Sequence, residues 1–184
     1  MPLPRLVLYP GCNSDTKIDV ERIKKSLLDI GLIESHINEG MAYLPGKNFL
    51  QLLTFLGCSP NINLHPDEGE NYCHIYFGEL SKDPLCLGHT SSAKPKCPQC
   101  KTVIQDWKKN SLWQDGTSLI QCEKCGAENT LNKLKWRREA GYGIFSIMIY
   151  NIHPHEAVPA EQLLLQLEKV TAASWDYCYA NNSE

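Results

Sequence analysis

Apolar residues recur at the spacing of an amphipathic helix in two stretches of the chain. The first runs from Val20 to Ile30, where apolar residues follow one another at intervals of three or four positions. Before it, Thr16-Lys17-Ile18-Asp19 fits a capping box, in which the Thr hydroxyl and the Asp carboxylate satisfy the first backbone N–H groups. Gly31 suits the C-terminal end. The pattern therefore predicts a helix between this box and Gly31.

The second helical pattern follows Pro159. Its buried face would consist of Leu163, Leu164, Leu167 and Val170. Because proline is favoured at the first position of a helix, we predict that this helix begins at Pro159.

Residues 49–56 are apolar nearly all round. Asn48 could cap a helix here, Gly57 could close it, and Pro60 could stop it. A helix without a polar side is buried on all sides. We therefore predict a helix over Asn48–Leu56 that lies between two surfaces.

Four segments have the composition of β-strands, namely Arg5–Tyr9, Tyr72–Phe77, Ile144–Ile152 and Trp175–Tyr179. With residues 94–138 set aside, the elements follow the order β-α-(α)-β and then β-α-β. We predict a two-layer α+β sandwich, for which the ferredoxin-like arrangement of two β-α-β halves is one candidate. A mixed α/β sheet with a different strand order is the alternative.

The residues set aside differ in composition from the rest of the chain. We predict one discontinuous domain, the body, from residues 1–93 and 139–184, and an inserted module of residues 94–138. The polar stretch 81–96 would be the linker into the module, and the way out would fall near residues 138–143. The module has a formal charge of +6 and the remainder has −9, which together give the −3 of the chain.

Two pairs of cysteines within the module have the spacing of a metal site. They are Cys97-Pro98-Gln99-Cys100 and Cys122-Glu123-Lys124-Cys125, with 21 residues between them. A C-x-x-C turn presents two thiolates, and two such turns supply the four tetrahedral ligands that Zn²⁺ prefers. A redox dithiol is the rival interpretation, but it usually has one pair at a helix N-terminus after a strand, and neither pair has that context. We predict one structural zinc held by Cys97, Cys100, Cys122 and Cys125.

Residues 95–137 resemble a zinc ribbon. Gly126 follows the second pair as it does in ribbon turns, whereas Lys101 stands where the first pair would have glycine, so its turn is expected to be less regular. Residues 101–104 and 118–121 would be two short strands. Four protein ligands leave zinc no open coordination position, so the metal is not expected to be catalytic.

The module also combines basic and aromatic side chains. Single-stranded nucleic acid could stack its bases on Trp107 and Trp113 and place its phosphates on Lys108, Lys109, Arg137 and Arg138. The alternative is that Trp107, Trp113 and Trp136 build the core of a small module, whose positive surface docks on the acidic body or contacts a protein partner.

Outside the module, His153, His155 and Glu156 follow a strand and precede a helix, where catalytic groups are common. An enzyme with this site in the body is therefore a further alternative. The neighbouring Cys73 and His74 would point to opposite faces of a strand and could not share a metal.

Two further thiol pairings are weaker. Cys86 and His89 could share a metal, but no other ligands are assigned to them. A nucleophilic Cys58 would need a base such as His65 or His153.

Composition sets the remaining expectations. No apolar run approaches the length of a membrane span, and the N-terminal segment lacks the features of a signal peptide. We therefore expect a cytoplasmic protein with reduced thiols, in which Cys12, Cys58, Cys73, Cys86 and Cys178 are free or bound elsewhere. The combined prediction is a non-enzymatic binding or adaptor protein with a structural zinc.

Overall fold

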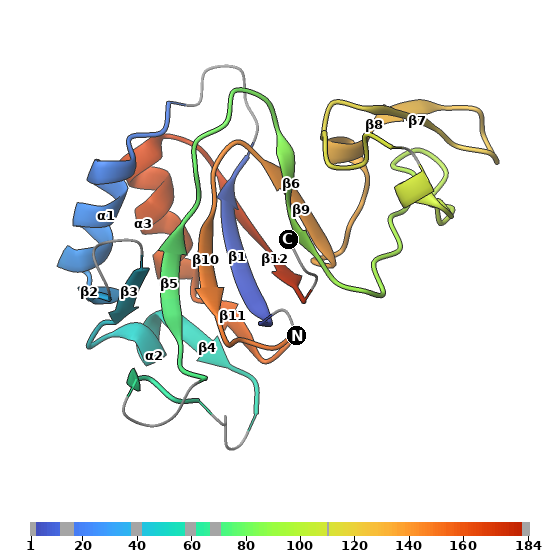
Figure 1. Cartoon of the computed structure of the whole chain (residues 1–184). Helices are drawn as coiled ribbons and strands as arrows, with labels where there is room; N and C mark the ends of the chain where they lie inside the picture. The colour runs from blue at the N-terminus through green and yellow to red at the C-terminus, as the bar shows by residue number, and fades with distance from the viewer. Residues whose placement is uncertain are drawn as a thin grey trace.

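The computed structural model describes residues 3–11, 17–37, 42–57, 62–66, 71–109 and 111–181. Within them the chain forms a six-stranded antiparallel sheet, three two-stranded sheets and three α-helices, which is an α+β architecture (Figure 1). The large sheet has the order β12 (Trp175–Ala180), β1 (Arg5–Pro10), β10 (Ile147–Tyr150), β5 (His74–Phe77), β3 (Ala42–Pro45) and β2 (Ile33–Ile37). The α-helices are α1 (Val20–Asp29), α2 (Phe49–Leu52) and α3 (Glu161–Thr171).

Two β-α-β units interleave in the large sheet. Strands β1 and β5 are both antiparallel to β10, which lies between them, and they are therefore parallel to each other. In the same way β10 and β12 are parallel on either side of β1. Helix α1 lies in the connection from β1 to β5, and α3 lies in that from β10 to β12. This order meets the requirement of two interleaved β-α-β halves, while the ferredoxin-like arrangement itself stays a prediction.

The helices cover one face of the large sheet (Figure 1). Residues alternate between the faces of a strand, and Leu6 and Leu8 of β1 join the main core with Ile147 and Ile149 of β10. The helices contribute their apolar sides to this core through Ile23, Leu27, Leu163 and Leu167. A separate small cluster lies on the other face of the sheet around Val7, Met148 and Cys178.

The first and third helices were predicted, with shifted ends. The side chain of Asp19 caps α1 by accepting a hydrogen bond from the backbone N–H of Arg22 at 3.0 Å. Thr16, the other half of the predicted box, lies outside the described residues. Gly31 follows α1 with a φ of 75°, which an L side chain rarely adopts. Helix α3 begins at Glu161, so the predicted start at Pro159 is wrong, because Pro159 ends strand β11 (Ala157–Pro159).

The predicted helix over Asn48–Leu56 is wrong beyond Leu52. The chain becomes extended at Leu53 and forms β4 (Leu53–Phe55), which pairs with β11 (Ala157–Pro159). A run in which most positions are apolar suits a strand as well as a helix. Asn48 makes no capping bond, and its side-chain amide instead donates to the carbonyl of Ile30 at 2.9 Å.

Both predicted linkers contain strands. Strand β6 (Leu85–His89) lies within the predicted entry, and β9 (Ala140–Gly143) lies within the predicted exit. They pair with each other, so the two ends of the module are held together by a ladder. Strands β5 and β10 are also shorter than the predicted segments 72–77 and 144–152.

The hairpin of the module differs from the predicted one. Strand β7 (Leu119–Gln121) pairs with β8 (Glu128–Thr130), whereas Val103 forms only an isolated bridge with Lys96. Hydrogen bonds of the backbone also tie the module to the last strand of the sheet. The N–H of Tyr179 donates to the carbonyl of Arg138 at 2.8 Å.

None of the helices in the described segments has the length and apolar character needed to cross a bilayer.

Candidate metal centre

The two cysteine turns have the same backbone geometry. In the first, Cys97 N–H donates to the carbonyl of Thr102 at 2.9 Å, and Lys101 N–H donates to the carbonyl of Cys97 at 3.0 Å. In the second, Cys122 N–H donates to Ala127 at 2.9 Å, and Gly126 N–H donates to Cys122 at 2.8 Å. Each turn therefore directs its two thiols to one side.

Lys101 and Gly126 occupy equivalent positions, and both have a left-handed backbone, with φ values of 62° and 71°. The expected irregularity of the first turn is wrong, because Lys101 adopts the conformation that glycine would adopt. For an L residue that conformation costs roughly 1–2 kcal/mol. The first turn therefore keeps its shape at the expense of local strain.

The four sulfur atoms form one cluster between these turns. All four lie within 4.8 Å of one another. The distance from Cys97 Sγ to Cys125 Sγ is 3.8 Å, and that from Cys100 Sγ to Cys122 Sγ is 3.6 Å. Zinc–sulfur bonds of about 2.3 Å place tetrahedral sulfurs about 3.8 Å apart, whereas a disulfide needs about 2.0 Å. The donor set and its spacing therefore fit a four-thiolate metal site.

The site lies at the surface of the module, with two sulfurs inside and two outside. Cys97 and Cys122 are buried, Cys100 is half-buried and Cys125 is exposed. Hydrogen bonds from the side chain and the backbone of Thr102 lower the pKa of Cys100 to about 6. This contact of Thr102 was not anticipated from the sequence, although a Ser or Thr two residues after a C-x-x-C pair is a visible signal.

Tryptophans build the core of the module next to the site. Trp107 and Trp136 are only 6% and 7% exposed, and their rings meet edge to face with centroids 4.8 Å apart. Trp107 Nε1 donates to Ala93 at 3.0 Å. The predicted stacking of bases on Trp107 is therefore wrong, because its ring is covered by protein.

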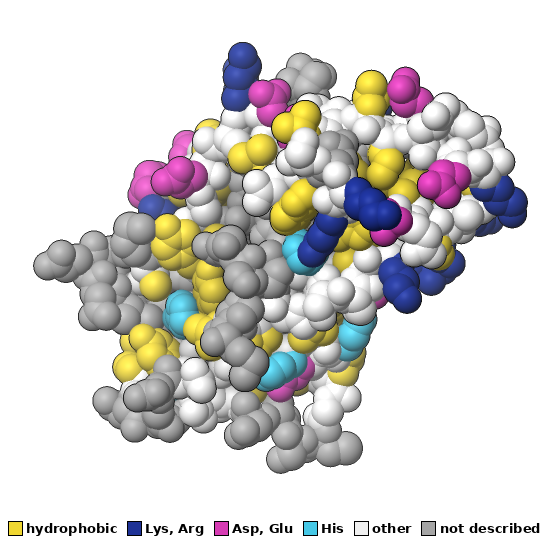
Figure 2. All heavy atoms as spheres, turned by 45° about the vertical axis from the view of Figure 1, so that its right-hand side comes forward, with side chains coloured by type: hydrophobic (Ala, Val, Ile, Leu, Met, Phe, Trp, Pro, Cys, Tyr) yellow, Lys and Arg dark blue, Asp and Glu magenta, His cyan; other side chains and the backbone are white. Residues whose placement is uncertain are grey.

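Residues outside the predicted module complete this core. His89 packs edge to face on Trp107 and Trp113, and Tyr142 of β9 packs on Trp136. The division into body and module stays a prediction, since the second core draws on both sides of its boundary. Lys108, a predicted phosphate contact, lies over the rings of Trp107 and Trp113. Figure 2 shows other Lys and Arg side chains gathered on the outer part of the module.

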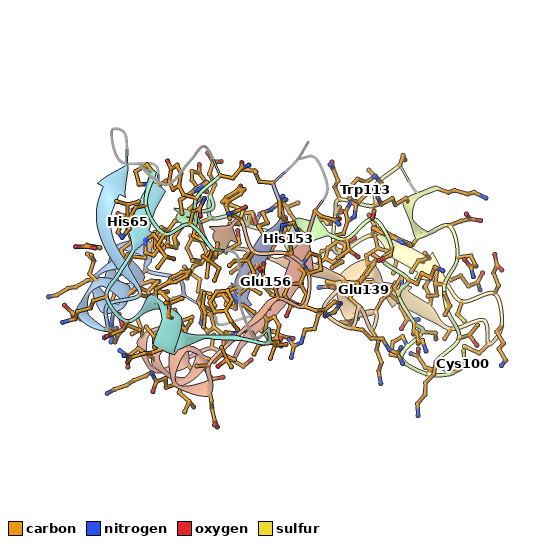
Figure 3. All side chains as sticks on the ribbon, turned by 90° about the horizontal axis from the view of Figure 1, so that it is seen from below. His65, Cys100, Trp113, Glu139, His153 and Glu156 are labelled. Carbon is orange, nitrogen blue, oxygen red and sulfur yellow. The ribbon has the colours of Figure 1, made fainter. Side chains whose placement is uncertain are left out.

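The histidine and glutamate candidates lie far from the cysteines. In Figure 3, His153 and Glu156 lie near the middle of the view, and Cys100 lies at its right-hand end. His153 and His155 are exposed, and the carboxylate of Glu156 accepts a hydrogen bond from the N–H of His153 at 2.8 Å. Glu156 thus stabilises its own turn, and the structure brings no third functional group to it among the described residues.

The remaining thiols and histidines have packing roles in the described part of the chain. Cys73, Cys86 and Cys178 are free thiols, and burial raises the pKa of Cys73 to about 12. His74 stacks on Tyr150 with ring centroids 4.8 Å apart, on the face of the sheet opposite Cys73.

The weaker thiol hypotheses gain no support. His89 Nδ1 lies 2.9 Å from the carbonyl of Thr90. Among the described residues, no further ligand joins Cys86 and His89 to complete a metal site. His65 is exposed. Cys12 and Cys58 lie outside the described residues.

Comparisons of the chain with protein-family models, with curated proteins and with solved structures give no match.

Proposed function

We propose that the protein binds one zinc ion through Cys97, Cys100, Cys122 and Cys125, and that this metal is structural. The observation that carries the proposal is the convergence of four sulfurs within 4.8 Å, with two pairs at 3.6 and 3.8 Å. Zinc would supply the cross-link between two turns and the positive charge that compensates four thiolates. Four protein donors would leave no position for a substrate, so the metal would do no chemistry.

The role that follows is that of a non-enzymatic binding protein, located in the cytoplasm, where thiols remain reduced. Exposed His153 and His155, and a Glu156 engaged in its own turn, give the enzyme alternative little support. The resemblance to a zinc ribbon covers only the module, and in this proposal the module presents the surface that contacts a partner.

Metal analysis of protein purified without added metal tests the proposal. We expect one zinc per chain, with none in Cys122→Ser and full occupancy in the matched control Cys86→Ser, since Cys86 lies outside the cluster. Tetrathiolate sites also accept iron, which would appear as visible absorption. If Cys122→Ser fails to fold, titration of the metal-free wild-type chain with Co²⁺ replaces it, and we expect thiolate charge-transfer bands. A metal-free protein with a disulfide between the two pairs would overturn the proposal.

A further inference from the structure

A basic groove lies where the module meets the body. It has a volume of about 540 Å³ and includes four cations, Lys133, Lys135, Arg137 and Arg138, with Tyr9 and Tyr177. Among the described residues that line it, the one acidic side chain is Asp176, which pairs with Arg138. We call this surface the basic groove, and we propose that it binds the sugar-phosphate backbone of single-stranded nucleic acid.

The cations of the basic groove are held in place by the core of the module. Lys133, Lys135 and Arg137 are exposed, while the intervening Leu134 and Trp136 are 5% and 7% exposed. The backbone of Lys135 exchanges two hydrogen bonds of 3.0 Å with Lys96. Every second residue of this segment is thus anchored, and the cations between the anchors project to one side.

Two adjacent arginines in this segment adopt a backbone that arginine rarely adopts. Arg137 and Arg138 have φ values of 54° and 70° in a turn closed by Glu139 N–H and the carbonyl of Trp136 at 2.9 Å. Turns of this kind usually have Asn and Gly at these positions.

The contacts of the Arg138 side chain offset the strain of its left-handed backbone. Its guanidinium donates to the carbonyl of Tyr177 at 3.1 Å and lies 3.9 Å from the centroid of that ring. Within the described residues, the side chain of Arg137 makes no ion pair or hydrogen bond. Local strain that the fold does not compensate is typical of functional positions, which favours a role for Arg137 in binding.

The chemistry of the basic groove matches a chain of phosphates. Lys133, Lys135 and Arg137 all line the same groove, so one strand that passes through it could place successive phosphates against several cations. The partly exposed ring of Tyr9 offers a flat surface for a base, and the guanidinium of Arg138, which lies over the ring of Tyr177, offers a second one.

A single strand fits better than a duplex. A duplex is usually read by a helix in its major groove, and the helices within residues 94–138, as far as the structure describes them, are 3₁₀ turns of three residues. A single strand needs only a positive groove with aromatic surfaces. The proposal thus keeps the predicted contacts at Arg137 and Arg138, and it replaces Trp107 by Tyr9 and by the stacked pair of Arg138 and Tyr177.

The inference rests on the proposed zinc site, because Lys96, which pairs with Lys135, directly precedes Cys97. Zinc content is therefore measured for every variant below. A variant that keeps its zinc and loses binding tests the basic groove alone.

The test is a titration of fluorescently labelled oligouridylate and oligothymidylate at several salt concentrations. The groove variant combines Lys133→Gln, Lys135→Gln and Arg137→Gln. The matched control combines Lys25→Gln, Lys82→Gln and Lys169→Gln, which removes the same charge at three exposed lysines away from the groove. We expect the groove variant to bind about tenfold or more weakly and to have a salt slope smaller by about 2, while the control stays near wild type. An equal loss in both variants, no wild-type binding at low salt, or equally tight binding of polyglutamate would overturn the proposal.

Single variants separate binding from folding. Arg137→Asn removes the charge and tolerates the left-handed backbone, so it should raise the melting temperature and weaken oligonucleotide binding together. Arg137→Lys keeps the charge and should bind like wild type. A purely structural role for Arg137 predicts no weakening in Arg137→Asn, and that result would contradict the proposal.

Discussion

In the body, Leu6, Leu8, Ile147 and Ile149 alternate along two central strands and bury their side chains against two helices. The module has strands of three residues, and its core contains two tryptophans and two of the clustered cysteines. A small unit buries too little apolar surface to offset the entropy of ordering its chain, and small natural domains commonly add metals or disulfides for this reason. The comparison teaches that, if the proposed zinc is bound, one chain combines two sources of stability, which are apolar burial in the body and a metal cross-link in the module.

Removal of the metal should break this comparison most strongly. Structural zinc contributes on the order of 10 kcal/mol in small metal-dependent folds, so Cys122→Ser or chelation should unfold the module and leave the body folded. Three of the four tryptophans lie in the module, so their fluorescence should shift to longer wavelength while the helical circular dichroism persists. Loss of both signals together would show that the two regions do not separate.

The converse change removes apolar contacts from the body. Leu27 is fully buried in α1, and Leu27→Ala should cost about 2–5 kcal/mol of body stability. The neighbouring Leu28 is 43% exposed, and Leu28→Ala is the matched control. Denaturant unfolding measures the loss, and the zinc content of both variants should equal that of wild type. A Leu27→Ala protein that releases zinc would contradict the separation.

The two cysteine turns can be compared within the module itself. Lys101→Gly should stabilise the module by about 1 kcal/mol, because glycine adopts the left-handed backbone without strain. Gly126→Ala should destabilise it by a similar amount, since a Cβ at Gly126 would meet no neighbour and only the backbone strain counts. Zinc affinity, measured by competition with a chelator, should change in the same two directions. If the two substitutions changed stability in the same direction, the two turns would not be equivalent.

The smallest expected effect concerns pH. Burial lowers the pKa of His89, and the positive charges of Lys108 and Arg5 lower it further. The hydrogen bond with the Thr90 carbonyl opposes this shift without cancelling it. The unfolded chain takes up this proton near pH 6.5 and the folded protein only at lower pH, so the folded state loses stability as pH falls below about 6.5. His89→Gln should lose less stability than wild type between pH 7 and 5.5, whereas the exposed His65 gives a control, His65→Gln, that follows wild type. Denaturant midpoints at both pH values decide between these outcomes.

Local patterns in the sequence were sufficient to predict the cysteine cluster and two of the helices. The C-x-x-C spacing placed the four cysteines together because each pair is fixed by its own turn, and the helical periodicity located α1 and α3. Tertiary pairing decided the rest. The apolar run from Phe49 divides into α2 and β4 because Leu53 finds a partner strand in β11, and no local signal distinguishes these outcomes.

The candidate binding surface was predictable only in part. Arg137 and Arg138 were candidate contacts, but Tyr9 and Tyr177 reach the same groove from distant parts of the chain. Trp107 and Trp113 were predicted to stack on bases because they lie among basic residues. His89, which lies outside the predicted module, packs on both of their rings instead. Composition identifies which side chains a region contains, whereas exposure depends on which other segments cover them.

The position of β1 has a consequence for the order in which the chain folds. Its partners on both sides, β10 and β12, are encoded near the other end of the chain, and Arg5 pairs with Ala180. Pairings across such long sequence separations form slowly, because loop closure precedes the gain in contacts. The cysteine turns need only local segments, so during synthesis we expect the module to capture its metal first. Strand β1, which is synthesised well before β12, would then stay partly unpaired until β12 is made, and in that interval it would be a target for chaperones that bind exposed strands.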